Sequence, residues 1–182
     1  TYGELTGDGF SVKAARFDAV VAFATAGGND LAQLFDSPHA DVFYGDPENG
    51  ALYNDTYYTR AKYFEQVHAY ATAGGPDVAY LYDSTGNDTF YANDTEGTIY
   101  GDGFLNRAKS FESIYGFASD AGRDVTYFVG SAGNDTFEGD PTQATIRSDA
   151  YFRRAEAFEE VRAAGGGGYD EAYLHDSDAD DQ

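Results

Sequence analysis

Cysteine, methionine and tryptophan are absent from the 182-residue sequence. Without cysteine the chain can form no disulfide, no thiolate metal site and no catalytic thiol. Basic residues are scarce, because 11 Lys and Arg stand against 32 Asp and Glu and give a formal net charge of −21. Nucleic acid needs a basic face, so we expect no nucleic acid partner. An anionic membrane surface is disfavoured for the same reason. No apolar run approaches the length of a membrane-spanning helix, so we expect no membrane insertion.

Acidity of this size is common in disordered chains, but the rest of the composition contradicts disorder. Hydrophobic residues make up 42% of the chain and aromatic residues 16%, which is enough apolar surface to form a core. A compact chain with this net charge repels itself unless counter-ions bind. The composition therefore favours a folded chain that binds cations.

The sequence repeats with a period of 47 residues. Gly-Asn-Asp-Thr-Phe stands at 86–90 and again at 133–137. The repeated phenylalanines that precede an acid are Phe17, Phe64, Phe111 and Phe158. Since more than a dozen columns keep this register, we read the chain as a single repeat array. It divides into a partial unit at 1–16, whole units at 17–63, 64–110 and 111–157, and a partial unit at 158–182.

Each unit has the pattern of strands and turns. The segments "VVAFATA" at 20–26, "VHAYATA" at 67–73 and "DVAYLYD" at 77–83 alternate with the period of two that is typical of strands. Turn residues separate such segments, as in "GDPENG" at 45–50 and "DSTGND" at 83–88. No stretch carries a convincing helical stripe. The pattern predicts an all-β fold.

Two all-β architectures fit the unit. In a β-solenoid, each unit would wind about two coils, so that one coil takes half of the repeat. A sub-period supports this, because the pattern of Glu65, Val67 and Ala69 recurs half a repeat later at Asp88, Phe90 and Ala92. In the alternative, each unit is a four-stranded antiparallel module such as a propeller blade. A propeller must close a ring, and the partial end units would leave its closing blade one strand short, so we favour the solenoid.

The phrases around the repeated glycines resemble the nonapeptide of haemolysin-type (RTX) calcium-binding repeats, Gly-Gly-x-Gly-x-Asp-x-apolar-x. The matched residues are Gly86, Asp88, Phe90, Gly133, Asp135 and Phe137, with weaker matches at Gly27, Gly28, Asp30, Gly74, Gly75 and Asp77. In that family, glycine carbonyls and the Asp of adjacent turns hold Ca²⁺, so the resemblance implies calcium ligation by these Asp residues. The chain departs from the family pattern because Ser or Thr replaces the first Gly and tandem nonapeptides are missing. The whole unit is also similar to tandem repeats of very long planctomycete surface proteins. That resemblance implies no known activity for the chain.

Elementary chemistry also favours calcium at the acidic turns. Ca²⁺ takes six to eight oxygens at about 2.3–2.6 Å, and turns with glycine at positive φ expose carbonyls beside carboxylates. Coils stacked about 4.8 Å apart would bring the carboxylates of one column together, and a cation between rungs would relieve their repulsion. The candidate calcium ligands are Asp30, Asp36, Asp41, Asp77, Asp83, Asp88, Asp124, Asp135, Asp170, Asp176 and Asp181. The alternative is plain turn chemistry, in which Asp and Asn cap their own backbone.

Two other sets of residues have simple interpretations. The basic column Lys13, Arg60, Arg107 and Arg154 is expected to form exposed ion pairs with the acids after the repeated phenylalanines, for example Arg60 with Glu65. The three histidines occupy different phases of the repeat, so we expect no shared metal site among them.

The pattern favours a structural protein over an enzyme. Catalytic residues normally occur once on a repeated scaffold, whereas here the acids repeat and no common catalytic motif is present. We therefore expect a non-enzymatic structural module of an extracellular or cell-surface fibre or adhesin-type protein, stabilised by calcium. A glycan- or protein-binding module is the alternative, since a stacked sheet offers a long face. A polysaccharide lyase or epimerase on a β-solenoid is the third reading.

The ends of the sequence lead to an expectation about assembly. Neither end carries the polar cap of a monomeric repeat protein, and bare strand edges invite pairing. We expect self-association end to end, as a filament or as continuation into further repeats, with a surface glycan as the other candidate partner.

Overall fold

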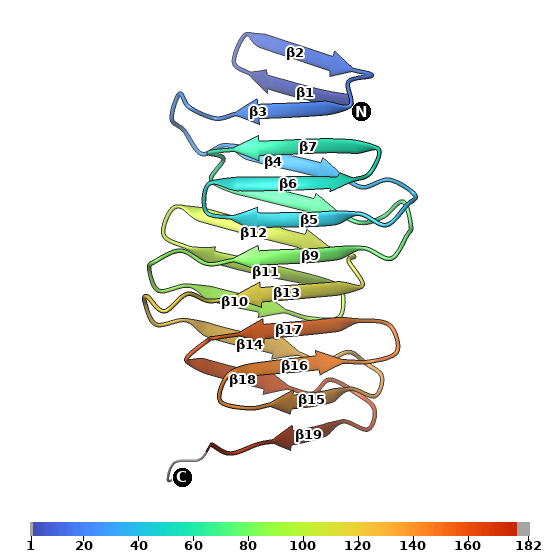
Figure 1. Ribbon diagram of the computed structural model, residues 1–182, viewed down its shortest axis with the longest axis vertical. Coiled ribbons are helices and arrows are strands. Elements are labelled where there is room, and N and C mark those ends of the chain that lie inside the picture. Colours follow the sequence, from blue (N-terminus) through green and yellow to red (C-terminus); the bar gives the residue numbers. More distant parts are fainter. Residues whose placement is uncertain (1, 178–182) are drawn as a thin grey trace.

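The computed structural model describes residues 2–177, which form nineteen β-strands and no helix. The strands stack along one long axis as a β-solenoid (Figure 1). The predicted fold class is therefore confirmed. Within these residues there is no helix of the length and apolar character needed to cross a membrane.

A hairpin of β1 (Tyr2–Gly7) and β2 (Phe10–Ala15) lies at the amino end, and each whole unit then supplies five strands. The first unit contains β3 (Ala19–Phe23), β4 (Leu31–Phe35), β5 (Val42–Asp46), β6 (Asn49–Asn54) and β7 (Tyr57–Lys62). The second contains β8 (Gln66–Tyr70), β9 (Val78–Tyr82), β10 (Thr89–Ala92), β11 (Glu96–Gly101) and β12 (Phe104–Lys109). The third contains β13 (Ser113–Phe117), β14 (Val125–Val129), β15 (Thr136–Gly139), β16 (Gln143–Arg147) and β17 (Phe152–Glu156). The last partial unit supplies β18 (Glu160–Ala164) and β19 (Glu171–Leu174).

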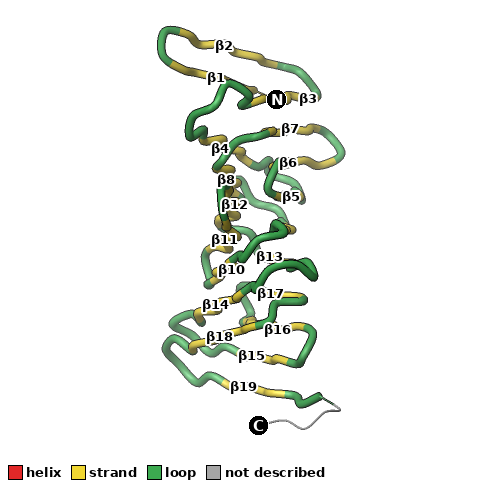
Figure 2. Tube along the Cα trace, turned by 90° about the vertical axis from the view of Figure 1, so that its left-hand side faces the viewer, coloured by secondary structure: helices red, strands yellow, loops and turns green. Residues whose placement is uncertain are grey.

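The chain winds between two sheets that form the two layers seen in Figure 2. The seven-stranded sheet has the order β18-β14-β10-β11-β12-β8-β4, and the ten-stranded sheet has the order β19-β15-β16-β17-β13-β9-β5-β6-β7-β3. In the second unit, β8 lies in the first sheet, β9 in the second and β10 in the first again. Strands β11 and β12 then stay beside β10 as an antiparallel meander. Successive units therefore place their meanders on opposite sheets.

The winding differs from the predicted two coils per unit. The sub-period of half a repeat corresponds to one full coil, from β8 to β10 in the same sheet. The second half of the unit holds the antiparallel meander and a half coil, so each unit winds one and a half coils. The difference arises because turns such as "ANDTE" at 92–96 reverse the chain inside its sheet. Antiparallel strands, considered above as a separate architecture, thus occur within the solenoid.

The half coil sets which residues become neighbours. In the parallel pairs that join coils, Phe90 lies opposite Thr126 and Val67 lies opposite Asn106, so partners are less than one repeat apart in the sequence. Residues that are one full repeat apart, such as Phe90 and Phe137, lie in opposite sheets. The sequence period is therefore not the stacking period.

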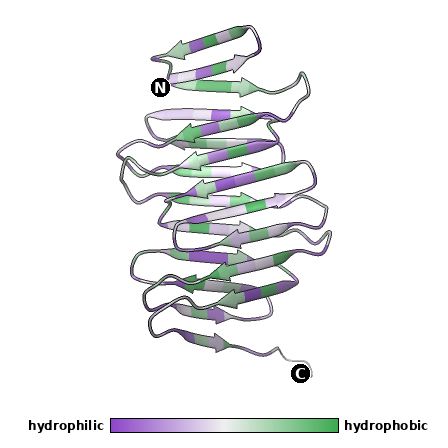
Figure 3. Cartoon of the chain, turned by 180° about the vertical axis from the view of Figure 1, so that it is seen from behind, coloured by the Kyte–Doolittle hydropathy of each residue, from purple (hydrophilic) through white to green (hydrophobic). Residues whose placement is uncertain are grey.

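The repeated apolar columns form the core between the sheets. Phe43 and Phe90, Leu52 and Ile99, and Ala61 and Ala108 are all buried. Hydrophobic and hydrophilic residues alternate along many of the strands (Figure 3), as expected when one face of each sheet is packed inward.

A positive φ recurs once per unit, directly before the repeated phenylalanine. The residues are Arg16, Tyr63, Ser110 and Ala157, with φ between 63° and 65°. A left-handed residue ends the meander and turns the chain toward the opposite sheet, where Phe64, Phe111 and Phe158 are buried. Non-glycine residues rarely adopt this conformation, so its recurrence shows that the crossover is built the same way in each unit.

Two buried polar side chains connect the sheets. Arg153 on β17 is fully buried, and its guanidinium donates to the carbonyls of Asn93 at 2.8 Å and Asp94 at 2.9 Å, in the meander turn of the opposite sheet. Asn106 on β12 donates to the carbonyl of Asp46 at 2.8 Å, which also lies on the opposite sheet. No local pattern in the sequence predicts these contacts.

Candidate metal centre

The repeated acids stand where the chain enters a new strand. Asp88 immediately precedes β10, Asp124 precedes β14 and Glu159 precedes β18. These strands are parallel, and β14 lies between β10 and β18. The amide of Asp88 donates to Asp124 Oδ1 at 2.7 Å, and the amide of Asp124 donates to Glu159 Oε2 at 2.6 Å. Each carboxylate thus accepts the backbone N–H of the acid one coil earlier.

The same link recurs through the described chain. Its other members are Asp30 to Glu65 at 2.7 Å, Asp41 to Asp77 at 2.8 Å, Asp77 to Glu112 at 2.8 Å and Asp135 to Asp170 at 3.0 Å. The expectation that one Asp column stacks on itself is wrong, because residues one repeat apart lie in opposite sheets. Instead, three different columns interleave, and most of the acids serve as backbone acceptors.

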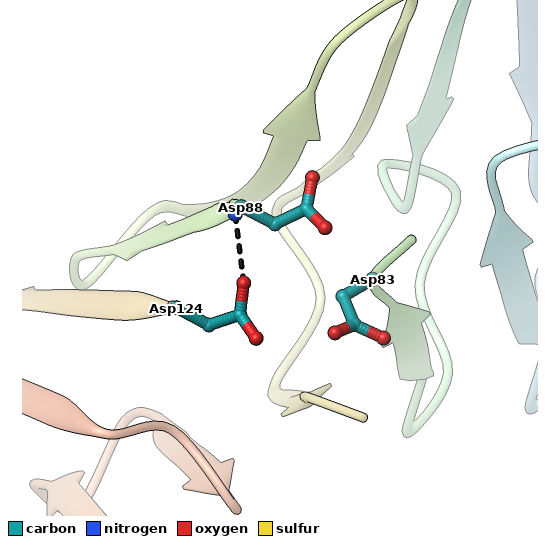
Figure 4. Close-up of side chains that lie close together, drawn as sticks. All are labelled: Asp83, Asp88 and Asp124. Carbon is teal, nitrogen blue, oxygen red and sulfur yellow. Dashed lines mark hydrogen bonds between the residues drawn. The ribbon is translucent and has the colours of Figure 1, made fainter. Parts of the chain in front are cut away.

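One place in this arrangement gathers three carboxylates. Asp83 follows β9, Asp88 precedes β10 and Asp124 precedes β14, so the three meet where one crossover loop lies over the next. One oxygen from each lies within 4.8 Å of the others, the single such trio among residues 2–177. Figure 4 shows Asp83 facing the Asp88 and Asp124 pair from a separate strand end.

The two crossover loops hold the carboxylates in place. Asp88 Oδ2 accepts the amide of Ser84 at 2.9 Å and its hydroxyl at 2.7 Å, which closes the first loop. Asp83 Oδ2 accepts the amide of Ser119 from the second loop at 2.7 Å. Gly122, at φ +98°, leaves room for the carbonyl of Gly86, where a side chain would collide. The close approach of the loops therefore requires glycine here.

Two oxygens of the trio have no partner. Asp88 Oδ1 and Asp124 Oδ2 are buried without a hydrogen bond, while the two residues are only 2% and 0% exposed. An unpartnered buried polar atom is costly, and more so on a charged group. None of the ion pairs found among residues 2–177 involves this trio.

The electrostatics of the trio are unfavourable for three anions. Burial raises the pKa of Asp124 to about 6, and the charges of Asp83, Glu159 and Asp88 add to this, against the amide of Asp88, which lowers it. Burial also raises the pKa of Asp83. Either a proton or a cation would relieve the repulsion, and carboxylate oxygens are the ligands that Ca²⁺ and Mg²⁺ prefer.

In the first unit, Asp36, Asp41 and Asp77 occupy the positions of Asp83, Asp88 and Asp124. Their carboxylates have different hydrogen-bond partners. Asp41 Oδ1 accepts the side-chain amide of Asn54 at 2.8 Å. Tyr57 lies beside Asp41, and burial together with that charge raises the pKa of its hydroxyl well above the usual range. Asp36 accepts the amide of Ala73 at 2.8 Å, and burial raises the pKa of Asp77 to about 6.

In the third unit the trio is incomplete. Gly130 stands where the other units have Asp36 and Asp83. Asp135 Oδ1 accepts the hydroxyl of Tyr151 at 2.7 Å. The positions of Asn54 and Tyr57 are Gly101 and Phe104 in the second unit, neither of which has a side-chain donor. The lack of a side-chain donor at these two positions was the sequence signal for the unpartnered oxygen of Asp88.

The remaining candidate ligands are dispersed. Asp30 pairs with Glu65 through its amide and is partly buried, whereas Asp170 and Asp176 are exposed. Asp181 lies outside the described residues.

The basic column does not pair as expected. Arg60 contacts the side chain of Asn49, on the neighbouring meander strand, and Glu65 instead accepts the amide of Asp30. Arg107 likewise pairs with Glu96 on β11. These contacts run across the meander because strand neighbours are closer than the next crossover. They leave the trio without a cationic side chain.

No protein-family model matches the chain, and no curated protein or solved structure gives a significant match.

Proposed function

We propose that the chain is a structural repeat module of an extracellular or cell-surface fibre or adhesin-type protein, stiffened by calcium at its acidic loops. The observation that carries this proposal is the use of the repeated carboxylates. Six of them accept a backbone amide from the preceding coil, so they join coil to coil along the stack. Because these carboxylates bond the backbone, they favour a structural role for the chain over the activity of a lyase or epimerase.

Location is the direct test of this role. Antibodies against the chain should label intact source cells, and external protease should release fragments of it before the cells lyse. Labelling only after permeabilisation would contradict an extracellular fibre.

We also propose that the ends of the solenoid pack against further coils of the same kind, from a second copy or from the same chain. Phe137, Ile146, Val161 and Leu174 are among the residues that line a hollow of about 760 Å³ at the carboxyl end. Exposed large apolar residues at the amino end include Phe10, Val12, Phe17, Val21 and Phe23. Sedimentation should detect concentration-dependent association, and a strict monomer at all concentrations would contradict contact between copies.

A glycan-binding role is the second candidate, because one outer surface has suitable chemistry. Tyr44, Tyr53, Tyr58, Asn49 and Arg60 surround a shallow hollow of about 310 Å³ on the outer face of the ten-stranded sheet. Tyrosine rings stack on sugars, and amide and guanidinium groups bond their hydroxyls. A glycan array should then show binding that Tyr53→Ala removes and Tyr100→Ala, on the other sheet, leaves intact. An array without any hit would exclude this role for the glycans tested.

A further inference from the structure

We infer that the chain binds one hard divalent cation between Asp83, Asp88 and Asp124, and that the equivalent positions in the first and third units bind none. This inference deepens the calcium part of the proposed function by giving its site and stoichiometry. It concerns the isolated chain and holds whether or not the protein lies at a cell surface.

The first support is the pair of unpartnered oxygens. Asp88 Oδ1 and Asp124 Oδ2 are buried, belong to nearly fully buried side chains, and lie in the trio that Asp83 completes. Asp83 is only partly buried, so water can reach the site from its side. Three carboxylates together with water provide the oxygen ligands that Ca²⁺ requires.

The second support is charge. Carboxylate oxygens within 4.8 Å of one another repel strongly when they are shielded from water. Across the described residues, no Lys, Arg or His makes an ion pair with a member of the trio. A divalent cation bound by the three carboxylates would offset this repulsion.

The third support is the comparison between units. In the first unit the Asn54 amide donates to Asp41 Oδ1, and in the third unit the Tyr151 hydroxyl donates to Asp135 Oδ1. At the two corresponding positions the second unit has Gly101 and Phe104, which carry no side-chain donor for Asp88. The third unit also lacks the third acid, because Gly130 replaces it. A hydrogen-bond donor thus stands in for the cation in two of the three units.

Isothermal titration calorimetry of the chelator-treated chain with CaCl₂ at pH 7.4 and constant ionic strength tests the inference. We expect one Ca²⁺ per chain. Calcium sites of extracellular modules have Kd values of about 10⁻⁴–10⁻³ M, so the titration must reach millimolar calcium. Asp83→Asn and Asp88→Asn should each weaken binding at least tenfold, whereas the matched first-unit variant Asp36→Asn should bind as the parent does.

Phe104→Tyr gives a test that a general loss of folding cannot imitate. Phe104 occupies the position of Tyr151, so the new hydroxyl should donate to Asp88 Oδ1 as Tyr151 does to Asp135. Calcium affinity should fall at least tenfold while the melting temperature of the metal-free protein stays the same or rises. Tyr151→Phe is the control and should keep the stoichiometry at one, because its unit has no third acid.

Four results would overturn the inference: no binding up to about 10 mM calcium, about three ions per chain, equal losses from Asp36→Asn and Asp83→Asn, or undiminished binding by Phe104→Tyr. Binding that Asp36→Asn removes would reject this site and leave calcium stiffening of the module standing. Binding at this site in a protein located inside cells would reject the fibre role alone.

Discussion

At the scale of residues, the repeated acids have two uses. Six carboxylates accept an amide from the preceding coil and are structural, as with Asp77, which accepts the amide of Asp41. The trio of Asp83, Asp88 and Asp124 keeps unpartnered oxygens in addition. The difference depends on the two residues that lack a side-chain donor beside Asp88, Gly101 and Phe104.

The structural use predicts unequal costs of removing an acid. Asp135 accepts the amide and hydroxyl of Ser131 and the hydroxyl of Tyr151, so Asp135→Ala leaves one buried and two partly buried donors unpaired. We expect a loss of about 2–4 kcal/mol in the free energy of unfolding. Asp94 is exposed, and Asp94→Ala should stay within about 0.5 kcal/mol of the parent. Urea denaturation of both variants in chelator measures the difference, and equal small losses would contradict the structural use.

The raised pKa of Asp77 predicts an unusual pH dependence. Burial and the charges of Glu112, Asp41 and Asp36 raise it to about 6 in the folded chain, although the amide of Asp41 lowers it, whereas an unfolded Asp titrates near 3.9. The folded state therefore binds more protons between these values, and this contribution to stability is present below about pH 4 and lost as pH rises through about 6. Carboxylates with lowered pKa values, such as Glu65 and Asp140, act in the opposite sense but titrate at lower pH.

The metal-free protein should accordingly be more stable at pH 5 than at pH 7, by about 1 kcal/mol for Asp77 alone. Denaturant titrations at the two pH values measure this. Asp77→Asn should reduce the difference in stability between the two pH values. A parent that is clearly less stable at pH 5 would contradict the raised pKa of Asp77.

At the scale of elements, the fold depends on the alternation of meanders between sheets. The sequence pattern was sufficient to predict strands, turns and a coil of half a repeat, because period-two alternation and turn residues are local signals. It did not predict the stacking partners. A unit that winds one and a half coils pairs residues that are less than one repeat apart, such as Phe90 and Thr126, and no single column reveals that distance. The metal centre was only partly predictable, because its ligands come from three different columns.

A cysteine pair tests the stacking distance, and the absence of native cysteine makes the experiment clean. Tyr91 and Tyr127 are partners on the neighbouring strands β10 and β14. Neighbouring strands lie within disulfide range, so Tyr91→Cys with Tyr127→Cys should cross-link on mild oxidation. Tyr91→Cys with Glu138→Cys, one full repeat apart and in opposite sheets, should not. The reverse outcome by peptide mass mapping would contradict the alternation of the units.

The buried Arg153 joins the elements of the two sheets. Besides the turn carbonyls of Asn93 and Asp94, its guanidinium bonds the carbonyls of Glu112 and Phe152 at 3.0 and 2.9 Å. Burial lowers its pKa to about 10, so it stays charged at neutral pH.

Arg153→Met should lower the free energy of unfolding by about 2–4 kcal/mol, because it leaves buried carbonyls without a donor. The exposed Arg147 of the same unit provides the control, and Arg147→Met should be nearly neutral. Equal stability of the two variants in denaturant would mean that Arg153 does not connect the sheets.

At the scale of the whole molecule, a net charge of −21 is held on a narrow stack of two sheets. Backbone amides offset part of this charge where they donate to the repeated carboxylates, and three carboxylates meet at Asp83, Asp88 and Asp124. A cation that binds the folded chain alone would stabilise it by mass action, by about 2.7 kcal/mol at a hundredfold excess over Kd. For a chain of this length that corresponds to a shift in Tm of about 5–10 °C.

The most direct test of calcium stiffening is thermal unfolding of the whole chain, followed by far-UV circular dichroism, in calcium and in chelator at matched ionic strength and pH 7.4. We predict a Tm several degrees higher in calcium for the parent and a much smaller shift for Asp88→Asn. A parent with the same Tm in both buffers would contradict the proposed role of calcium.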